Sequence, residues 1–348
     1  MSHHWRSPIP FAVVLALIGS TSCQPQHSSD AASSLDTPIE PAVIQQASTR
    51  QSEVGDRPTS SPSPGDRLSE STDSLGEEPS HEHSAVVYAR HERPSSIIHT
   101  VTISPSSSVE IGVAVADDGL ATVEQQAESV EAIAAINAGF FDPNNQQTTS
   151  HVIIDGEHGA DPRDNDRLIS NPNLAPYLAA ILNRSEFRRL ICDGQVVFNI
   201  AFHQESLPNS TCVLQDAVGG GPQLLPVLRS VEEGFLAYGD DGQVIRDAIG
   251  SLSPNARSAI GITETGAIVF AMAAQHPEVG DGTGLSLPDL ADFLASIGVQ
   301  SALNLDGGSS SGLFVEGTVY YGRFDPEGTP IERPVQSIVF VRPRASSQ

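Results

Sequence analysis

The composition of this chain changes sharply near residue 84, and this change limits which part of the chain can form a folded domain. Residues 24–83 are rich in Ser, Pro, Gln and acidic residues, and they carry eleven acidic side chains against three arginines. Such a segment cannot bury enough apolar surface to offset the chain entropy that folding costs. We therefore predict a disordered tether over residues 24–83 and a folded domain over residues 84–348.

Beyond Ser84 the sequence is dominated by short runs of β-forming residues. They predict strands at Ile97–Ile103, Val109–Val115, Ile133–Asn137, His151–Ile154, Val196–Phe202, Ser258–Thr263, Ala267–Ala271, Ala302–Leu305, Gly312–Val315, Thr318–Tyr321 and Ser337–Val341. Strands and helices do not alternate regularly. The pattern therefore predicts an α+β fold, with a mixed β-sheet core and a few packed helices in a single domain after the tether.

Three segments have helical character. Ser286–Ile297 has a capping serine, Pro288 in its first turn and Gly298 just after its end. The apolar spacing of Val123, Ala127, Val130 and Ala134 predicts a second helix, which leads into the strand ending at Asn137. Residues Asn173–Leu182 predict a third, shorter helix.

The first 23 residues have the character of a signal peptide. Arg6 precedes the apolar run Phe11–Ile18, which is too short to span a bilayer, and small residues lead up to Cys23. This pattern predicts export. The protein is then a cell-envelope lipoprotein lipidated at Cys23, with a lipid anchor as its contact with the membrane, or a secreted or periplasmic protein.

The remaining cysteines, Cys192 and Cys212, form a pair in a protein predicted to be exported, and so predict a disulfide. Two buried free thiols are the alternative.

The chain has 43 acidic residues against 18 basic ones, a formal charge of −25. This balance argues against nucleic acid and anionic membranes as partners. A phosphate site in such a chain has to be a local cationic spot.

The segment Asn304-Leu-Asp-Gly-Gly-Ser-Ser310 is the most informative one for function. A strand ends there in Asp306, which a strand end can hold rigidly towards a cleft. Gly307 and Gly308 let a ligand approach the backbone, and their N–H groups together with Ser309 and Ser310 can bind an anion or hydroxyls. A tight surface turn is the alternative interpretation.

Further blocks follow the same design of a polar or glycine residue at a strand boundary. They are Ala135-Ile-Asn-Ala-Gly-Phe-Phe-Asp142 with Asn137, Gly219-Gly-Gly-Pro-Gln-Leu-Leu225, Asn255-Ala-Arg-Ser-Ala-Ile-Gly261 with Arg257, and Arg333-Pro-Val335. Their order and spacing over residues 84–343 resemble the phosphodiester glycosidase family. That family includes the enzyme that uncovers mannose 6-phosphate tags by removing N-acetylglucosamine.

The resemblance implies that Asn137, Arg257 and Asp306 converge as a catalytic group that cleaves a sugar from a phosphodiester. Asp306 would act as nucleophile or as base for water, and Arg257 would bind the phosphate with two N–H groups. Asn137 would bind a hydroxyl or orient Asp306. The expected substrate contacts are Gly307, Gly308, Ser309, Ser310, Gly220, Gly221, Asp142 and Arg333.

Structural roles remain open for several of these residues. Arg257 can pair with a nearby acid, and Gly219–Gly221 can serve close packing. Asp142 and Glu264 are the fallback carboxylates. The sequence also departs from the family pattern, since Phe270-Ala-Met-Ala-Ala-Gln-His276 stands where relatives carry an acidic Asp-Gly-Arg stretch.

The expected function is an exported glycosidase acting on sugar-1-phosphodiester bonds in envelope or extracellular glycans, with no cofactor required. Two rivals remain. One is a catalytically weak envelope protein that binds polysaccharide in the same cleft. The other is a metal-dependent phosphodiesterase in which Asp306 and Asp142 hold Ca²⁺.

Overall fold

The computed structural model describes residues 85–106, 108–117, 119–279 and 282–344, and all of them belong to one compact unit. The predicted signal peptide, Cys23 and the whole tether lie in residues 1–84, outside the described residues.

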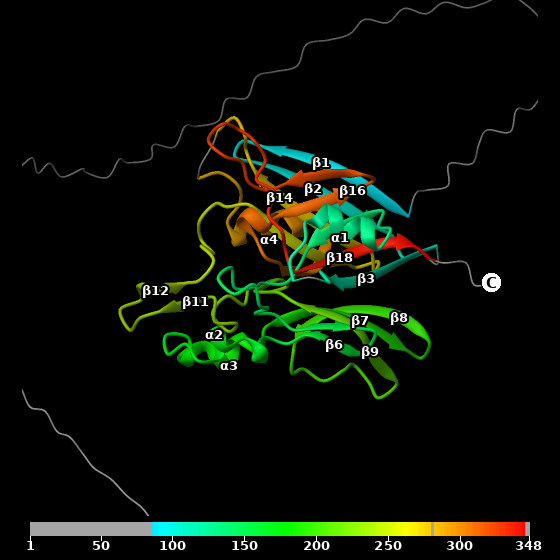
Figure 1. Ribbon diagram of the computed structural model, residues 1–348, viewed down its shortest axis with the longest axis horizontal. Helices are drawn as coiled ribbons and strands as arrows, with labels where there is room; N and C mark the ends of the chain where they lie inside the picture. Colours follow the sequence, from blue (N-terminus) through cyan, green and yellow to red (C-terminus); the bar gives the residue numbers. More distant parts are fainter. Residues whose placement is uncertain (1–84, 107, 118, 280–281, 345–348) are drawn as a thin grey trace, which may run out of the picture. The chain divides into compact units, whose positions relative to one another are not determined.

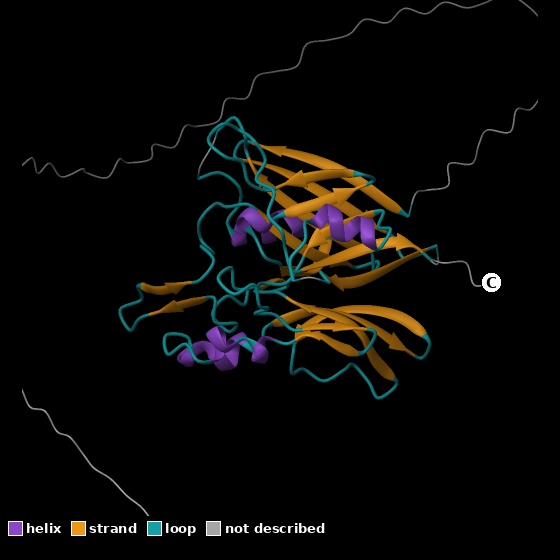
Figure 2. Cartoon of the chain, viewed as in Figure 1, coloured by secondary structure: helices purple, strands orange, loops and turns teal. Residues whose placement is uncertain are grey.

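Strands dominate the described part of the chain, and every named ladder is antiparallel (Figures 1 and 2). The first sheet has the order β1 (Val86–Arg93), β2 (Ser96–Ile103), β14 (Ile268–Gln275), β13 (Arg257–Thr263), β15 (Val299–Asn304) and β10 (Gln223–Leu225). The second has the order β17 (Thr318–Tyr321), β16 (Gly312–Val315), β4 (Ala134–Asn137), β18 (Ser337–Pro343) and β3 (Val109–Val115).

A third sheet has the order β6 (Glu157–Ala160), β5 (Val152–Ile154), β9 (Cys212–Gly219), β7 (Ser185–Cys192) and β8 (Gln195–Phe202). A separate hairpin joins β11 (Leu236–Tyr238) and β12 (Val244–Asp247). The helices are short: α1 (Val123–Ser129), α2 (Asp166–Ile169), α3 (Leu178–Ile181) and α4 (Leu287–Ser296), with 3₁₀ turns at Pro162–Asp164, Ala175–Tyr177 and Gly308–Ser310.

The main hydrophobic core lies between the first two sheets and takes in apolar residues of the third. Alternate strand residues such as Val101, Ile136 and Leu303 point into it, while Phe187 and Val218 enter from β7 and β9. On its other face the first sheet packs against α4, and the second sheet packs against α1. Both helices therefore cover sheets that are already buried on the inside.

The predicted strands are confirmed, because each of the eleven overlaps an observed strand. The fold is nevertheless more strongly β than predicted, since β1, β6, β7, β9, β10, β11 and β12 were not expected. The strand β7 was not predicted because the charged residues Glu186 and Arg188 interrupt its apolar pattern. Both are buried, and the pair is satisfied by a 2.7 Å bond from Arg188 Nε to Glu186 Oε1.

The helix predictions are confirmed in part. Ser286 caps α4 by accepting a bond from the Asp289 N–H, as expected. The apolar spacing predicted a helix from Val123 through Ala134, and this prediction is wrong at its C-terminal end. The helix α1 ends at Ser129, and Ala134 is the first residue of β4. Between them Glu131 has a φ of 54°, a left-handed conformation that stops a helix. Residues Asn173–Leu182 form only a 3₁₀ turn followed by α3.

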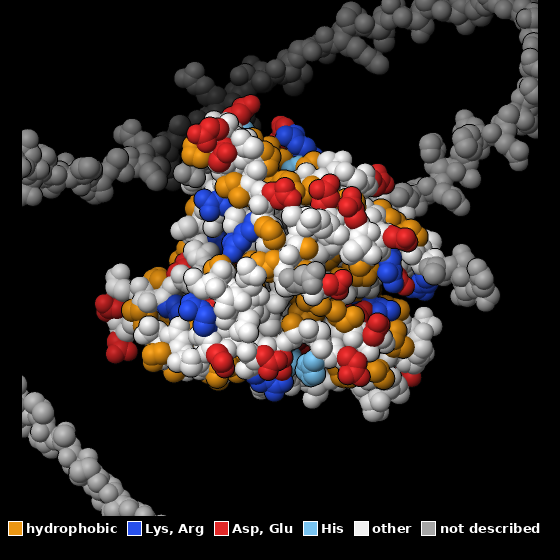
Figure 3. All heavy atoms as spheres, viewed as in Figure 1, with side chains coloured by type: hydrophobic (Ala, Val, Ile, Leu, Met, Phe, Trp, Pro, Cys, Tyr) orange, Lys and Arg blue, Asp and Glu red, His pale blue; other side chains and the backbone are white. Residues whose placement is uncertain are grey.

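The predicted disulfide is confirmed. Cys192 at the end of β7 and Cys212 at the start of β9 are direct cross-strand neighbours and are bonded. No helix within the described residues is long and apolar enough to cross a bilayer. On the face drawn in Figure 3, acidic side chains are spread widely, whereas arginines gather in a few places.

Candidate active site

The four sequence blocks around Asn137, Gly220, Arg257 and Asp306 meet in the structure. The Asp306 N–H donates to Ala138 O at 2.9 Å, and the Leu305 N–H donates to Ser258 O at 2.8 Å. The Gly221 N–H donates to Asn304 O at 2.7 Å. These backbone bonds bring together segments that are separated by 47 to 168 residues along the chain.

Asn137 is the polar centre of this junction. Its side chain is fully buried, and its Nδ2 donates a 2.7 Å bond to the carbonyl oxygen of Asp306. Its Oδ1 accepts bonds from Ser258 Oγ at 2.7 Å and from the Gly312 N–H at 3.1 Å. Of the two roles left open by the sequence, the geometry favours the one in which Asn137 orients Asp306.

Asp306 lies beside a small cavity of about 150 Å³. The cavity is lined by Phe140, Ile249, Asn255, Arg257, Asn304, Asp306, Gly307 and Gly308. Burial raises the pKa of Asp306 to about 6, although the Ser310 hydroxyl, the Arg333 guanidinium and the Gly307 N–H oppose this rise. A carboxyl group with such a pKa can change its charge near neutral pH.

Arg257 shares this cavity, but most of its donors are occupied. The buried guanidinium donates to the carbonyl oxygens of Leu285 (3.1 Å), Ile249 (3.0 Å), Gly250 (2.6 Å) and Ser253 (3.0 Å). An arginine has five N–H donors, so one remains free. The two-pronged phosphate contact expected from the sequence is therefore not available in this arrangement. The side chain instead holds the loop over residues 249–253 in place, and its burial lowers its pKa to about 10.

Arg333 is a more accessible cation near Asp306. One of its nitrogens donates a 3.0 Å bond to Ser309 Oγ, and its guanidinium lies 5.0 Å from the centre of the Phe141 ring. Its other donors have no protein partner within the described residues. The proximity of Ser309 and Arg333 joins two predicted substrate contacts at one edge of the site.

The expected carboxylate alternatives do not line the cavity. Asp142 binds Arg167 at 2.8 Å and also accepts bonds from Asn144. Burial alone would raise the pKa of Asp142, but those hydrogen bonds outweigh it and lower the pKa. Glu264 is exposed in the turn after β13, about 20 Å of strand away from Arg257 at the start of that strand. The structure therefore excludes Glu264 as a substitute for Asp306.

The glycines of the second block serve close packing. A Cβ on Gly220 would lie 2.6 Å from Asn304 O, and one on Gly221 would lie 2.4 Å from Glu233 Oε2. Neither residue lines the cavity, nor does buried Ser310. Gly307 and Gly308, by contrast, do lie on the cavity wall, as expected from the sequence.

Sequence reasoning missed the role of Asn304. Its Nδ2 donates to Gly221 O at 2.8 Å, but its Oδ1 has no hydrogen-bond partner within the described residues although the residue is 1% exposed. A buried acceptor without a partner is costly. Since Asn304 lines the cavity, this oxygen is suited to accept a bond from a ligand. The sequence signal that could have predicted this role is the position of Asn304 at the end of β15, two residues before Asp306.

A buried Glu233 and a half-buried Arg184 support the wall of the site. Glu233 accepts bonds from Ser185 and from the Gln223 N–H, which fixes the glycine block. Arg184 lies 3.7 Å from the Phe235 ring centre and 5.8 Å from that of Phe140. Phe140 lines the cavity, while Phe141 packs into the core, so the two adjacent rings have different roles.

Metal binding receives no support from the arrangement of ligand-type side chains. Across the described ranges, no group of three or more His, Cys, Asp or Glu residues is placed to share an ion. Asp142 and Asp306 do not meet at the cavity.

At least one solved structure shares the fold of this chain. No curated protein sequence matches the chain at a significant level. Among solved structures, the zebrafish N-acetylglucosamine-1-phosphodiester alpha-N-acetylglucosaminidase catalytic domain, auto-inhibited by its pro-peptide, is 18% identical with a TM-score of 0.53, and the match covers 76% of this chain and 86% of that one. A hypothetical protein from Synechocystis is 18% identical with a TM-score of 0.48; the match covers 74% of this chain but only 61% of that one.

The sequence profile of the phosphodiester glycosidase family matches residues 130–342, more than half of the chain, and this span contains Asn137, Arg257, Asp306 and Arg333. This chain therefore belongs to the phosphodiester glycosidase family.

Proposed function

We propose that the protein is an exported hydrolase that cleaves sugar-1-phosphodiester bonds in envelope or extracellular glycans. The observation that carries this proposal is the position of Asp306, a carboxylate with a raised pKa that shares a cavity with an arginine and an unpaired asparagine oxygen. Family membership gives the reaction class.

Cleavage of this bond needs little protonation of the leaving group by an acid catalyst. When the bond between the anomeric carbon and the phosphate oxygen breaks, the electron pair leaves with a phosphate ester, which is already a stable anion. The main demand is a negative charge beside the oxocarbenium-like carbon. Ionised Asp306 supplies that charge, as nucleophile or as the base that takes a proton from water.

The remaining residues have distinct parts. Arg333, whose free N–H groups are accessible, takes the phosphate oxygens that the sequence assigned to Arg257. The remaining N–H of Arg257 and its positive charge favour the same anion from inside the cavity. Asn304 Oδ1 accepts a bond from a sugar hydroxyl or amide, and Phe140 forms an apolar wall.

Export is supported by the N-terminal sequence and by the Cys192–Cys212 bond, because disulfides persist in oxidising compartments. Whether Cys23 carries a lipid is a separate question that mass spectrometry of the membrane fraction answers.

The deciding experiment incubates the purified protein with a sugar-1-phosphodiester, with and without a chelator. Free sugar plus a phosphomonoester is the expected product pair, with the same rate in both samples. A sugar-1-phosphate product would identify a phosphodiesterase instead, and loss of that activity with the chelator would make the phosphodiesterase metal-dependent. Saturable glycan binding without turnover would identify a polysaccharide-binding protein.

A further inference from the structure

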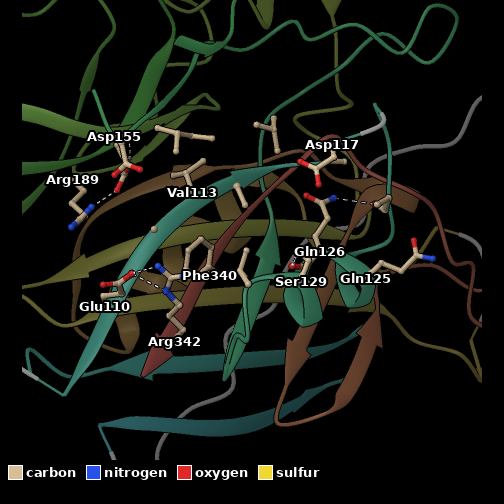
Figure 4. A pocket seen from close by; sticks show the side chains of 18 of the residues that line it. Glu110, Val113, Asp117, Gln125, Gln126, Ser129, Asp155, Arg189, Phe340 and Arg342 are labelled. Atoms are coloured by element: carbon tan, nitrogen blue, oxygen red, sulfur yellow. Dashed lines mark hydrogen bonds and ion pairs between the residues drawn. The ribbon is translucent and has the colours of Figure 1, made fainter. Parts of the chain in front are cut away.

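The largest cavity described for this protein lies away from Asp306, along the outer edge of β3 (Figure 4). It measures about 690 Å³, and a neighbouring cavity of about 510 Å³ shares Glu110 and Arg189 with it. Val109 and Ile111 line the second cavity, and Val113 and Val115 line the first. The two cavities meet at Glu110 and Arg189 and together follow the length of β3, and we call them the β3 groove.

This edge has free backbone groups. Even-numbered residues of β3 bond to β18, as shown by the Ala116 N–H donating to Gln336 O and the Arg344 N–H donating to Ser108 O, both at 2.9 Å. The odd-numbered residues, which alternate with them, therefore turn their N–H and C=O groups outwards. Within the described residues no strand pairs with this edge. Such a row of donors and acceptors is a template for another extended chain.

The first cavity carries an uncompensated negative charge. Its arginines are already paired, Arg189 with Asp216 at 2.5 Å and Arg342 with Glu110 at 2.6 Å. Its other two carboxylates, Asp117 and Asp155, have no cationic partner in the described part of the chain.

Gln126 gives independent evidence for a ligand here. The side chain is 4% exposed, and its Nε2 already donates to Ala121 O (3.1 Å) and Val335 O (2.9 Å). These two bonds fix the orientation of the amide, which leaves the buried Oε1 without a partner among the described residues. Figure 4 draws Gln126 at the same end of the cavity as Asp117. An acceptor and a carboxylate at one place suit a cationic donor.

We propose that this groove, from the apolar Val196–Phe198 segment to Asp117, docks an extended segment of a partner protein that pairs with β3 and places a Lys or Arg side chain at Asp117 and Gln126. Val196 and Val197 are 39% and 38% exposed and offer an apolar surface for the other end of the segment. The chain's own residues 24–83 carry eleven acidic side chains against three arginines, so charge disfavours them as the occupant.

The chain itself permits a clean test. All 18 basic residues are arginines, so the chain contains no lysine. The probe is the labelled peptide acetyl-Val-Thr-Val-Thr-Val-Lys-Thr-amide, added to the full chain and coupled with a carbodiimide. We expect its single lysine to form an amide mainly with Asp117 or Asp155, and not with the exposed Asp240, as located by mass spectrometry.

Matched variants separate backbone pairing from simple attraction. Val115→Pro removes an outward N–H and should weaken peptide binding, measured by fluorescence polarisation, about tenfold, whereas Val115→Ala should not. Asp117→Asn should weaken it about three- to fivefold, and Asp240→Asn should leave it unchanged. Melting temperatures of all four variants verify the fold.

Several outcomes would overturn the proposal. Coupling spread evenly over exposed carboxylates would remove the site. Equal binding of a peptide with alternate backbone nitrogens methylated would remove strand pairing. Displacement of the peptide by a neutral oligosaccharide, with undiminished affinity of that sugar for Val115→Pro, would make the groove a carbohydrate subsite.

Discussion

The Nδ2 of Asn137 donates a 2.7 Å hydrogen bond to the backbone carbonyl of Asp306, 169 residues further along the chain. Because Asn137 is fully buried and its Oδ1 is held by Ser258 and Gly312, this bond fixes the position of the Asp306 backbone without touching its carboxylate. The candidate nucleophile or base is thus positioned by Asn137, the last residue of β4.

Replacing Asp306 with Asn should abolish most of the activity and keep the fold. The substitution preserves shape but removes the charge needed at the anomeric carbon, so turnover should fall roughly 10³-fold or more. Turnover and melting temperature should be measured on the same preparation. Asp142→Asn is the matched control, because Asp142 is paired with Arg167 outside the cavity and its loss should leave turnover nearly unchanged. A folded, active Asp306→Asn protein would remove Asp306 from the mechanism.

Activity should rise with pH through about 6, the pKa of Asp306, because the ionised form is the active one. Stability should change in the opposite direction. The folded pKa lies above the unfolded value of about 3.9, so between these values the folded state binds more protons and stability falls as pH rises. The pH profile of kcat/KM and that of the unfolding free energy check both signs. Asp306→Asn should flatten this part of the stability profile.

Arg333→Met should shift the acidic limb of the pH–activity profile to higher pH. The Arg333 guanidinium opposes the raised pKa of Asp306, so removing its charge lets that pKa rise further. It should also raise KM for the phosphodiester, since an accessible phosphate contact is lost. An unchanged profile and KM would show that Arg333 contacts neither Asp306 nor substrate.

Arg257→Lys should act mainly on stability. Lysine cannot reach the carbonyls of Leu285, Ile249, Gly250 and Ser253 together, so the unfolding free energy should fall by about 2–3 kcal/mol. Chemical denaturation measures the unfolding free energy, and kinetics on the folded fraction measure any remaining effect on turnover and KM. A stable variant that fails only with the phosphodiester would restore the direct phosphate role expected from the sequence.

Loss of the Cys192–Cys212 bond should cost about 3 kcal/mol, the chain-entropy estimate for a loop of this length. The Cys192→Ser/Cys212→Ser double variant should therefore unfold at lower denaturant than the parent protein. Alkylation of unreduced, denatured parent protein is the control. Alkylation at both Cys192 and Cys212 in that sample would contradict the bond in solution.

Local sequence patterns predict much of the secondary structure. Alternating β-branched residues located eleven strands, and Ser286, Pro288 and Gly298 marked the ends of α4, because caps and turns depend on a few neighbouring residues. The blocks around Asn137, Arg257 and Asp306 likewise carried enough local pattern to name the family and to predict a candidate site.

The contacts of each group at the candidate site, by contrast, depend on how distant segments of the chain fold together. Arg257 has the residue type of a phosphate ligand, but four backbone carbonyls surround it, and no local pattern encodes that cage. Glu186 and Arg188 looked like surface residues until β7 buried them as a pair. The open edge of β3 depends on which strand lies last in the sheet. These properties arise from contacts between distant segments. The free energy of strand pairing depends on neighbours across the whole sheet, so no single stretch of the chain predicts it.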